Sequence, residues 1–162
     1  MDPLHLPESC SKTPPALRGA FGWALARLAR AFNGAQNAAL AEVDLTMRSF
    51  AVLATAADGA RTQLEIAQVV GLDKSTLVAT IDDLERRGLV ERRTDPADRR
   101  ARFIESTAQG RTLAARAARI IEETEAKLLE KFSPAEAAQL KSSLVALLLG
   151  GLHDEIQPGS CI

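Results

Sequence analysis

The sequence of 162 residues has few of the residue types on which many enzymes and secreted proteins depend. It contains two cysteines, Cys10 and Cys161, two histidines, His5 and His153, and no tyrosine. One cysteine near each end gives no disulfide framework and no metal-binding spacing such as C-x-x-C. Because no histidine or cysteine falls between residues 11 and 152, His-based triads and Cys/His metal sites have no members there. We therefore expect a protein that is not an enzyme and that uses no metal or cofactor.

Long apolar runs are also missing. The longest candidate, LVALLLGGL, is far shorter than the roughly 20 residues that a membrane-spanning helix needs. The N-terminal MDPLHLPESCSKTPP lacks the basic stretch followed by an apolar stretch that marks a secretion signal. These absences predict a cytoplasmic protein without a membrane partner. Free thiols are the default for Cys10 and Cys161 in a reducing cytoplasm, and a disulfide that involves them is the alternative. Its length suits one domain, or two small lobes that share a core.

A large net charge is absent too, because the formal net charge is −1. The charge is nevertheless unevenly distributed along the chain. Residues 86–102 hold seven arginines and three acids, a local charge of +4, whereas residues 122–136 hold five glutamates and two lysines. For nucleic-acid binding, the location of charge matters more than its sum. A charge block of this kind can also be a solvated surface, so other features must decide.

The first half of the chain predicts an arm followed by helices. Residues 1–15 hold four of the seven prolines and are expected to form an N-terminal arm. Apolar residues then recur at helical spacing up to about Leu40, which predicts one long helix; they are Leu17, Phe21, Leu25, Leu28 and Phe32. Thr46 is a predicted N-cap for the next helix, which should end at Asp58-Gly59.

Two short helices are predicted next. Thr62 and Glu65 form a capping box, in which each side chain satisfies a free amide of the first helical turn. Gly71 should end this helix, and Asp73 is a good N-cap for the following one, whose buried stripe would be Leu77, Ile81 and Leu84. Two short helices joined around a glycine are typical of a helix-turn-helix, although a generic helical hairpin has the same spacing.

The segment after this pair predicts a β-hairpin. GLVERRT and RARFIES each predict a strand, and DPAD between them is rich in turn-forming residues. A helix-turn-helix followed directly by a hairpin with a basic tip is a winged helix. The arginines of such a wing would reach DNA phosphates or the minor groove. The expected fold class is mainly α with a small β-hairpin wing.

The last third predicts two more helices. Thr107 is a predicted N-cap for a helix through about Glu130, and Ser133 with Glu136 forms a second capping box. The Ala-rich and Leu-rich stripes of these helices and of the first helix are too extensive to be buried within one small lobe. They therefore predict an obligate homodimer.

From about Leu45 to Gly110 the chain resembles the MarR (multiple antibiotic resistance regulator) family of transcription factors. The resemblance lies in LTMRSFAVL, TQLEIAQVVGLDKSTLVATIDDLERRGLVERR, DPADRRARF and STAQGR. It implies a homodimer that binds double-stranded DNA at a pseudo-palindromic operator, with one recognition helix per half-site. It divides the chain into an N-terminal arm (1–15), a helical dimerisation region (16–44 and 107–152), a winged helix-turn-helix DNA-binding lobe (45–106) and a C-terminal tail (153–162).

The resemblance implies a recognition helix from Asp73 to Arg87. Lys74 is the expected phosphate contact, and the residues expected to face base edges and thymine methyls are Ser75, Thr76, Val78 and Ala79. Many family members have arginine where Ala79 stands and a basic residue where Asp83 stands. We therefore expect weak direct readout, with more of the specificity coming from groove shape through the wing.

In the wing, the family's Asp-x-Arg pattern falls on Asp98, Arg99 and Arg100. The resemblance implies that Arg100 enters the minor groove and that Asp98 supports the wing. Arg99 and Arg92 are the expected phosphate contacts. Where the family usually has leucine, this chain has Ser106, which predicts weaker packing between the wing and the following helix.

Regulators of this family often respond to small aromatic or phenolic anions, and the candidate pocket residues here are Trp23, Arg27, Arg30 and Arg48. The expected function is that of a transcriptional regulator, a repressor that such a ligand relieves. The alternative is a winged-helix module that binds protein instead of DNA. Salt would distinguish the two, because DNA binding weakens steeply as salt rises.

Overall fold

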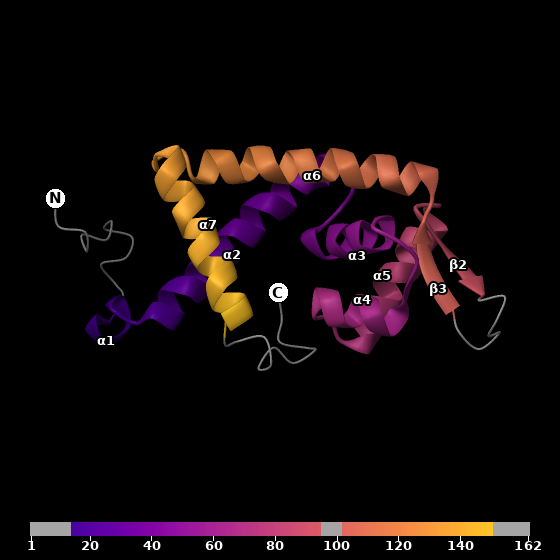
Figure 1. Ribbon diagram of the computed structural model, residues 1–162, viewed down its shortest axis with the longest axis horizontal. Coiled ribbons are helices and arrows are strands. Elements are labelled where there is room, and N and C mark those ends of the chain that lie inside the picture. Colours follow the sequence, from indigo (N-terminus) through magenta and orange to yellow (C-terminus); the bar gives the residue numbers. More distant parts are fainter. Residues whose placement is uncertain (1–13, 95–101, 151–162) are drawn as a thin grey trace.

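The computed structural model describes residues 14–94 and 102–150, and its fold is mainly α with a small antiparallel sheet, as predicted. A long helix, α6, spans the molecule (Figure 1). One of its ends covers a lobe of α3, α4, α5 and the sheet, and its other end meets α7. In chain order the elements are α1 (Pro15–Arg18), α2 (Phe21–Leu40), η2 (Ala41–Val43), α3 (Met47–Ala57), β1 (Arg61–Thr62), α4 (Gln63–Val70), α5 (Lys74–Arg86), β2 (Val90–Thr94), β3 (Arg102–Ser106), α6 (Ala108–Leu128) and α7 (Pro134–Gly150).

The hydrophobic core lies in the lobe. The predicted stripe of α5 is buried, because Leu77, Ile81 and Leu84 are each at most 1% exposed. These side chains repeat every three to four residues, so the opposite side of α5 faces outward. They pack in one cluster with residues of α3, α4, the sheet and α6 and with Leu89 just before β2; the cluster includes Val52, Leu53, Ile66, Ile104 and Ala117.

The helix-turn-helix forms as its capping residues predict. The Thr62 amide donates to Glu65 Oε2 at 2.7 Å, and the Glu65 amide donates to Thr62 Oγ1 at 3.3 Å. Hydrogen bonds from the Thr62 backbone and hydroxyl keep the pKa of Glu65 below its ordinary value. Gly71 ends α4 with φ of 66°, in the left-handed region that glycine tolerates. Asp73 then caps α5.

The sheet has the strand order β1-β3-β2, with both pairs antiparallel. The two strands of the wing pair from Val90 opposite Ser106 to Thr94 opposite Arg102. Strand β1 was not predicted, because its two residues overlap the N-cap of α4. The predicted DPAD turn falls within residues 95–101, outside the described residues.

The prediction of one continuous first helix is wrong. α1 ends at Arg18 and α2 begins at Phe21, so Leu17 lies on a separate short turn. Gly19 stands at the interruption, and glycine is among the residues least favourable to a helix. The long helix therefore begins one turn later than its apolar pattern indicated.

Ser106 does not leave a gap between the wing and α6. Its side chain is 1% exposed, and its hydroxyl donates to the Leu89 carbonyl at 3.3 Å. Gly110 lies directly against the same carbonyl, since a Cβ built on Gly110 would stand 1.9 Å from Leu89 O and 2.4 Å from Ser106 Oγ. Two small residues therefore let α6 approach the base of the wing more closely than larger side chains would permit.

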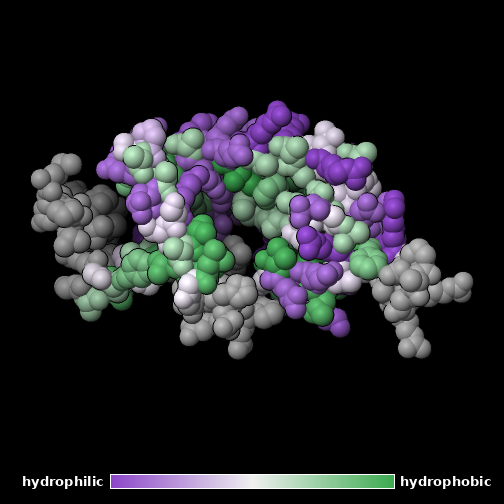
Figure 2. Space-filling model, viewed as in Figure 1, coloured by the Kyte–Doolittle hydropathy of each residue, from purple (hydrophilic) through white to green (hydrophobic). Residues whose placement is uncertain are grey.

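The helices away from the lobe are packed differently. α7 has no buried residue, and its large apolar side chains from Leu144 to Leu149 are 37–69% exposed. Figure 2 shows hydrophobic side chains on this side of the molecule. A polar contact ties the helices together, because Glu125 of α6 accepts from Gln36 of α2 at 3.4 Å and from Lys141 of α7 at 2.7 Å. In the described ranges, no helix is long and apolar enough to cross a bilayer.

Candidate nucleic-acid interface and ligand pocket

The outward side of α5 presents the predicted DNA-contacting residues. Lys74, Ser75 and Ala79 are exposed, and Thr76 and Val78 are half-buried. All five come from the first two turns of the helix, which is the part that a recognition helix directs into the major groove. Of the five side chains, only that of Lys74, the expected phosphate contact, belongs to a type that makes bidentate contacts with a base. The other four can offer a base only single hydrogen bonds or apolar contacts, and weak direct readout stays a prediction.

The N-terminus of α5 is occupied by its own cap. Asp73 Oδ1 accepts from the Ser75 hydroxyl at 2.5 Å and from the Thr76 amide at 2.9 Å. These hydrogen bonds, that of Ser75 above all, hold the pKa of Asp73 well below its ordinary value. A DNA phosphate on the axis of α5 would be repelled by this carboxylate. The Lys74 side chain is therefore better placed than the helix amides to contact a phosphate. The Ser75 hydroxyl donates to this cap and keeps its lone pairs free to accept a hydrogen bond.

The described part of the wing is held by ion pairs. Arg92, on β2, forms ion pairs with two carboxylates of α5, Asp82 and Glu85. Arg93, the next residue, pairs with Glu91 at 2.6 Å and with Glu105 of β3 at 3.2 Å. Arg92 and Arg93 are therefore both held by carboxylates of the protein itself.

Arg92 and Arg93 leave no excess positive charge, because together they face four carboxylates, Asp82, Glu85, Glu91 and Glu105. At the end of α5, Asp83 pairs in turn with Arg86 and, at 3.4 Å, with Arg87. The positive charge that the sequence concentrates between residues 86 and 102 is thus largely compensated where the structure describes it. Asp98, Arg99 and Arg100 lie outside the described residues.

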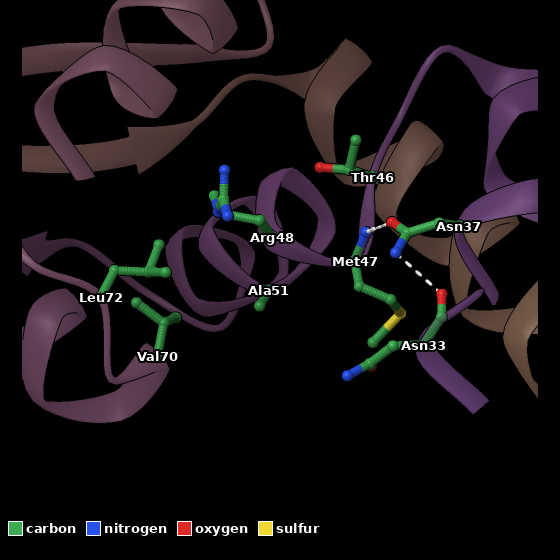
Figure 3. A pocket seen from close by; sticks show the side chains of 8 residues that line it. All are labelled: Asn33, Asn37, Thr46, Met47, Arg48, Ala51, Val70 and Leu72. Atoms are coloured by element: carbon green, nitrogen blue, oxygen red, sulfur yellow. Dashed lines mark hydrogen bonds between the residues drawn. The ribbon is translucent and has the colours of Figure 1, made fainter. Parts of the chain in front are cut away.

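A cavity of about 280 Å³ opens between α2, α3 and the turn that joins α4 to α5 (Figure 3). Asn37 closes it on one side, because its Oδ1 accepts from the Met47 amide at 2.8 Å and its Nδ2 donates to the Asn33 carbonyl at 2.8 Å. Apolar side chains form the other walls, with Arg48 as the cationic group. Its lining residues are Asn33, Asn37, Thr46, Met47, Arg48, Ala51, Val70 and Leu72.

The four predicted pocket residues lie at two places. Arg48 lines the cavity just described, whereas Trp23, Arg27 and Arg30 line a separate hollow of about 540 Å³ along α2. There the Arg27 guanidinium carbon lies 5.2 Å from the centre of the Trp23 ring, which is cation–π distance. Among the residues that the structure describes, those lining the second hollow all belong to α2, so these residues form one face of a helix.

Several lining residues of the first cavity were not predicted. Asn33 and Asn37 are four residues apart in an Ala-rich helix, and this spacing places two amides on one face. That signal was available in the sequence. Val70 and Leu72 carried none, because they look like ordinary core residues beside Gly71.

Comparison with known proteins decides the family. Residues 43–101 match the MarR family. A MarR-family transcriptional regulator from Rhodococcus sp. RHA1 is 32% identical, with a TM-score of 0.74, over 79% of this chain and 91% of the other. The chain belongs to the MarR family. It is therefore a winged-helix transcriptional regulator that binds DNA, as the sequence predicted.

Two further structures of the MarR family are similar over most of the chain. The transcriptional repressor CouR bound to a 23-mer DNA duplex is 32% identical, with a TM-score of 0.76, over 82% of this chain and 95% of the other. CouR from Rhodococcus jostii RHA1 bound to p-coumaroyl-CoA is 33% identical, with a TM-score of 0.73, over 85% and 97%. Proteins of this family are transcriptional regulators. Within the described ranges, no group of three or more potential metal ligands occurs.

Proposed function

We propose that this chain is a homodimeric repressor that acts in the cytoplasm, binds a pseudo-palindromic operator, and is released from it by a small aromatic ligand. The observation that carries the proposal is the outward side of α5, which lies exposed beside the wing while its other side is buried. The DNA-bound CouR structure supports the same use of this surface here.

The dimer would form through residues 16–44 and 107–152, leaving residues 45–106 to bind DNA. An apolar groove of about 420 Å³ between α2, α6 and α7 supports this division. Leu25 and Leu28 of α2 and Leu144 of α7 line it, and each is at least 36% exposed. A contiguous apolar surface of this kind marks a protein interface, and a second copy of the chain would cover it.

On DNA, Lys74 would contact a phosphate, and Ser75, Thr76, Val78 and Ala79 would face the bases. Arg100 would enter the minor groove, with Asp98 supporting it and Arg99 contacting a phosphate. Because Arg92 and Arg93 are already paired with carboxylates, Arg99 and Arg100 would supply much of the attraction to DNA.

Fluorescence anisotropy tests these roles with a duplex from the intergenic region beside the gene and a scrambled duplex, at two salt concentrations. Arg100→Ala should weaken operator binding roughly tenfold or more without changing the dimer, as expected for a good arginine contact with DNA. Lys74→Ala should weaken binding to both duplexes evenly. It should also lower by about one the salt slope, which is the slope of the logarithm of the binding constant against the logarithm of the salt concentration. Asp98→Ala should have a milder effect than Arg100→Ala. Operator binding by Arg100→Ala equal to that of the parent would contradict the role of the wing.

The ligand would occupy the cavity lined by Met47, Ala51 and Arg48. Its volume of about 280 Å³ lies near the lower end of the roughly 300–1,000 Å³ of small-molecule sites, which suits a single aromatic ring. Apolar walls would hold the ring, and Arg48 would face an anionic or acyl group. The p-coumaroyl-CoA of the CouR structure supports an aromatic acyl-CoA as the first ligand to test.

The ligand test adds p-coumaroyl-CoA, p-coumarate or CoA alone to the protein–operator complex. An aromatic compound should release the DNA, whereas CoA alone should not. Ala51→Leu should fill the cavity and reduce the response while leaving DNA binding intact. Ala38→Leu is the matched control, since Ala38 is exposed on α2 and does not line the cavity. If the ligand releases DNA equally from Ala51→Leu and Ala38→Leu, it binds at another site.

A further inference from the structure

We infer that Arg92 is a positioning residue, which neutralises Asp82 and Glu85 of the recognition helix and fixes the wing stem against it. This differs from the phosphate contact that the family resemblance implied for Arg92. The inference rests on the proposed DNA binding of α5 and concerns how that helix presents its charge to DNA.

The register of the wing shows where Arg92 points. Arg92 lies opposite Ile104 in the antiparallel pair of β2 and β3, and opposite residues project from the same face of a sheet. Ile104 is 1% exposed, and Val90, two residues before Arg92, is 2% exposed. Arg92 is therefore on the face of the sheet that turns toward the core and α5. Its side chain is only 25% exposed.

The contacts of Arg92 use its side chain and its backbone. The guanidinium pairs with Asp82 and with Glu85. The Arg92 amide also donates to Glu85 Oε1 at 3.3 Å. A charge-assisted hydrogen bond from a guanidinium fork to two carboxylates fixes geometry as well as charge. A DNA phosphate would have to displace one of these carboxylates to reach Arg92.

Without Arg92, the recognition helix would be electrostatically unsuited to DNA. Asp82 and Glu85 are three residues apart on α5, and their side chains are 55% and 38% exposed. Asp82 follows Ala79 by three residues, so it continues the side proposed to face the major groove. Two uncompensated carboxylates there would repel the phosphates. Arg92 removes most of this repulsion from within the protein.

Arg93 provides a matched control. It is the neighbouring residue on the same strand and is also paired with two carboxylates, Glu91 and Glu105. Its side chain is 61% exposed, and none of these three residues belongs to α5. Removing Arg93 therefore changes the net charge by the same amount without freeing carboxylates on the recognition helix.

The experiment is a double-mutant cycle on the full-length dimer, measured by anisotropy with the operator and the scrambled duplex. Arg92→Gln should weaken operator binding by about tenfold, within the range of coupled neighbours. Adding Asp82→Asn and Glu85→Gln should bring binding back to within about threefold of the parent, because the repelling charges are gone. The same two changes in the presence of Arg92 should improve binding much less. Arg93→Gln should weaken binding less than Arg92→Gln does.

Other outcomes would overturn the inference. If the two acid substitutions improve binding equally with and without Arg92, the residues are not coupled on DNA. If Arg92→Gln stays weak after both substitutions and its salt slope falls by about one, Arg92 is a phosphate contact. Arg92→Lys, which keeps the charge, should bind more tightly than Arg92→Gln, and circular dichroism shows whether each variant folds. Failure of the parent protein to prefer the operator would instead refute the proposed function.

Discussion

The lobe and the last helix use the same kind of residue for different purposes. In α5, Leu77, Ile81 and Leu84 are at most 1% exposed, whereas in α7 the leucines from Leu144 to Leu149 are 37–69% exposed. α7 is by composition the more apolar of the two helices, so apolar content alone would have predicted the opposite order of burial. The difference teaches that the lobe completes its own core, while α7 leaves its apolar side chains exposed, as the proposed dimer interface requires.

The two regions are alike in local chemistry. α4 begins with the capping box of Thr62 and Glu65, and α7 begins with that of Ser133 and Glu136, with amide-to-carboxylate distances of 2.7 and 2.8 Å. Helix initiation is therefore encoded equally in both places. The stability of α4 and that of α7 should therefore differ only through the side chains that pack against each helix. Substitutions can test this difference.

The largest effect is expected from Ile81→Ala. This side chain is fully buried, so its truncation should lower the free energy of unfolding by about 2–5 kcal/mol, at every protein concentration. Urea unfolding at two concentrations measures it. Leu147→Ala on α7 is the control and should matter only through dimerisation, with an effect that depends on concentration. If Ile81→Ala and Leu147→Ala lower the free energy of unfolding equally at every protein concentration, the lobe and α7 do not differ in the way described.

The next effect is expected from Leu144→Glu. This residue lines the apolar groove of α2, α6 and α7, and a buried unpaired charge in a dimer interface is costly. Light scattering at micromolar concentration should change from the mass of two chains to that of one. Ser142→Glu, on the same helix but outside the groove lining, should leave the dimer intact. A dimer that survives Leu144→Glu would locate the interface elsewhere.

A smaller effect is expected at the helix caps. Thr62→Ala should lower the free energy of unfolding by about 1 kcal/mol, because α4 packs in the core and unfolds with the lobe. Ser133→Ala should mainly increase local opening of α7, which hydrogen exchange detects as faster exchange of its first-turn amides. Equal losses of global stability in the two variants would show that α7 unfolds together with the lobe.

The smallest effect concerns pH. Glu65 and Glu136 both have a pKa below the ordinary 4.5 because of hydrogen bonds from Thr62 and Ser133. A carboxyl group with a lowered folded pKa contributes stability above its unfolded pKa and loses it as the pH falls through the folded value. Unfolding should therefore become easier as the pH drops below about 4.5. Glu65→Gln should reduce this acid dependence of the lobe, and Glu136→Gln should leave it unchanged.

The sequence was most informative where structure depends on neighbouring residues. Thr46, Thr62, Asp73 and Thr107 cap their helices as predicted, because a cap needs only the next three residues. Gly71 ends α4 for the same local reason. The fold class and family followed from such signals arranged in order.

What the sequence did not reveal depends on contacts between distant residues. The two-residue strand β1 forms only because Ile104 and Phe103 lie beside it. The partners of Arg92 are seven and ten residues away on another element, so its role could not be assigned from the basic stretch itself. Likewise Arg48 and Trp23 line different cavities, which no spacing in the sequence indicates.

The close contact at Gly110 makes α6 a rigid lever. Because the helix lies directly against Leu89, the base of the wing cannot move without it. Its 21 residues extend about 30 Å at 1.5 Å per residue, from the wing to the start of α7. A rotation of about 5° at the α7 end would displace the wing end by nearly 3 Å over that length. Since half-sites are read about 34 Å apart, a small shift at the proposed dimer interface would be enough to take a recognition helix out of register with its groove.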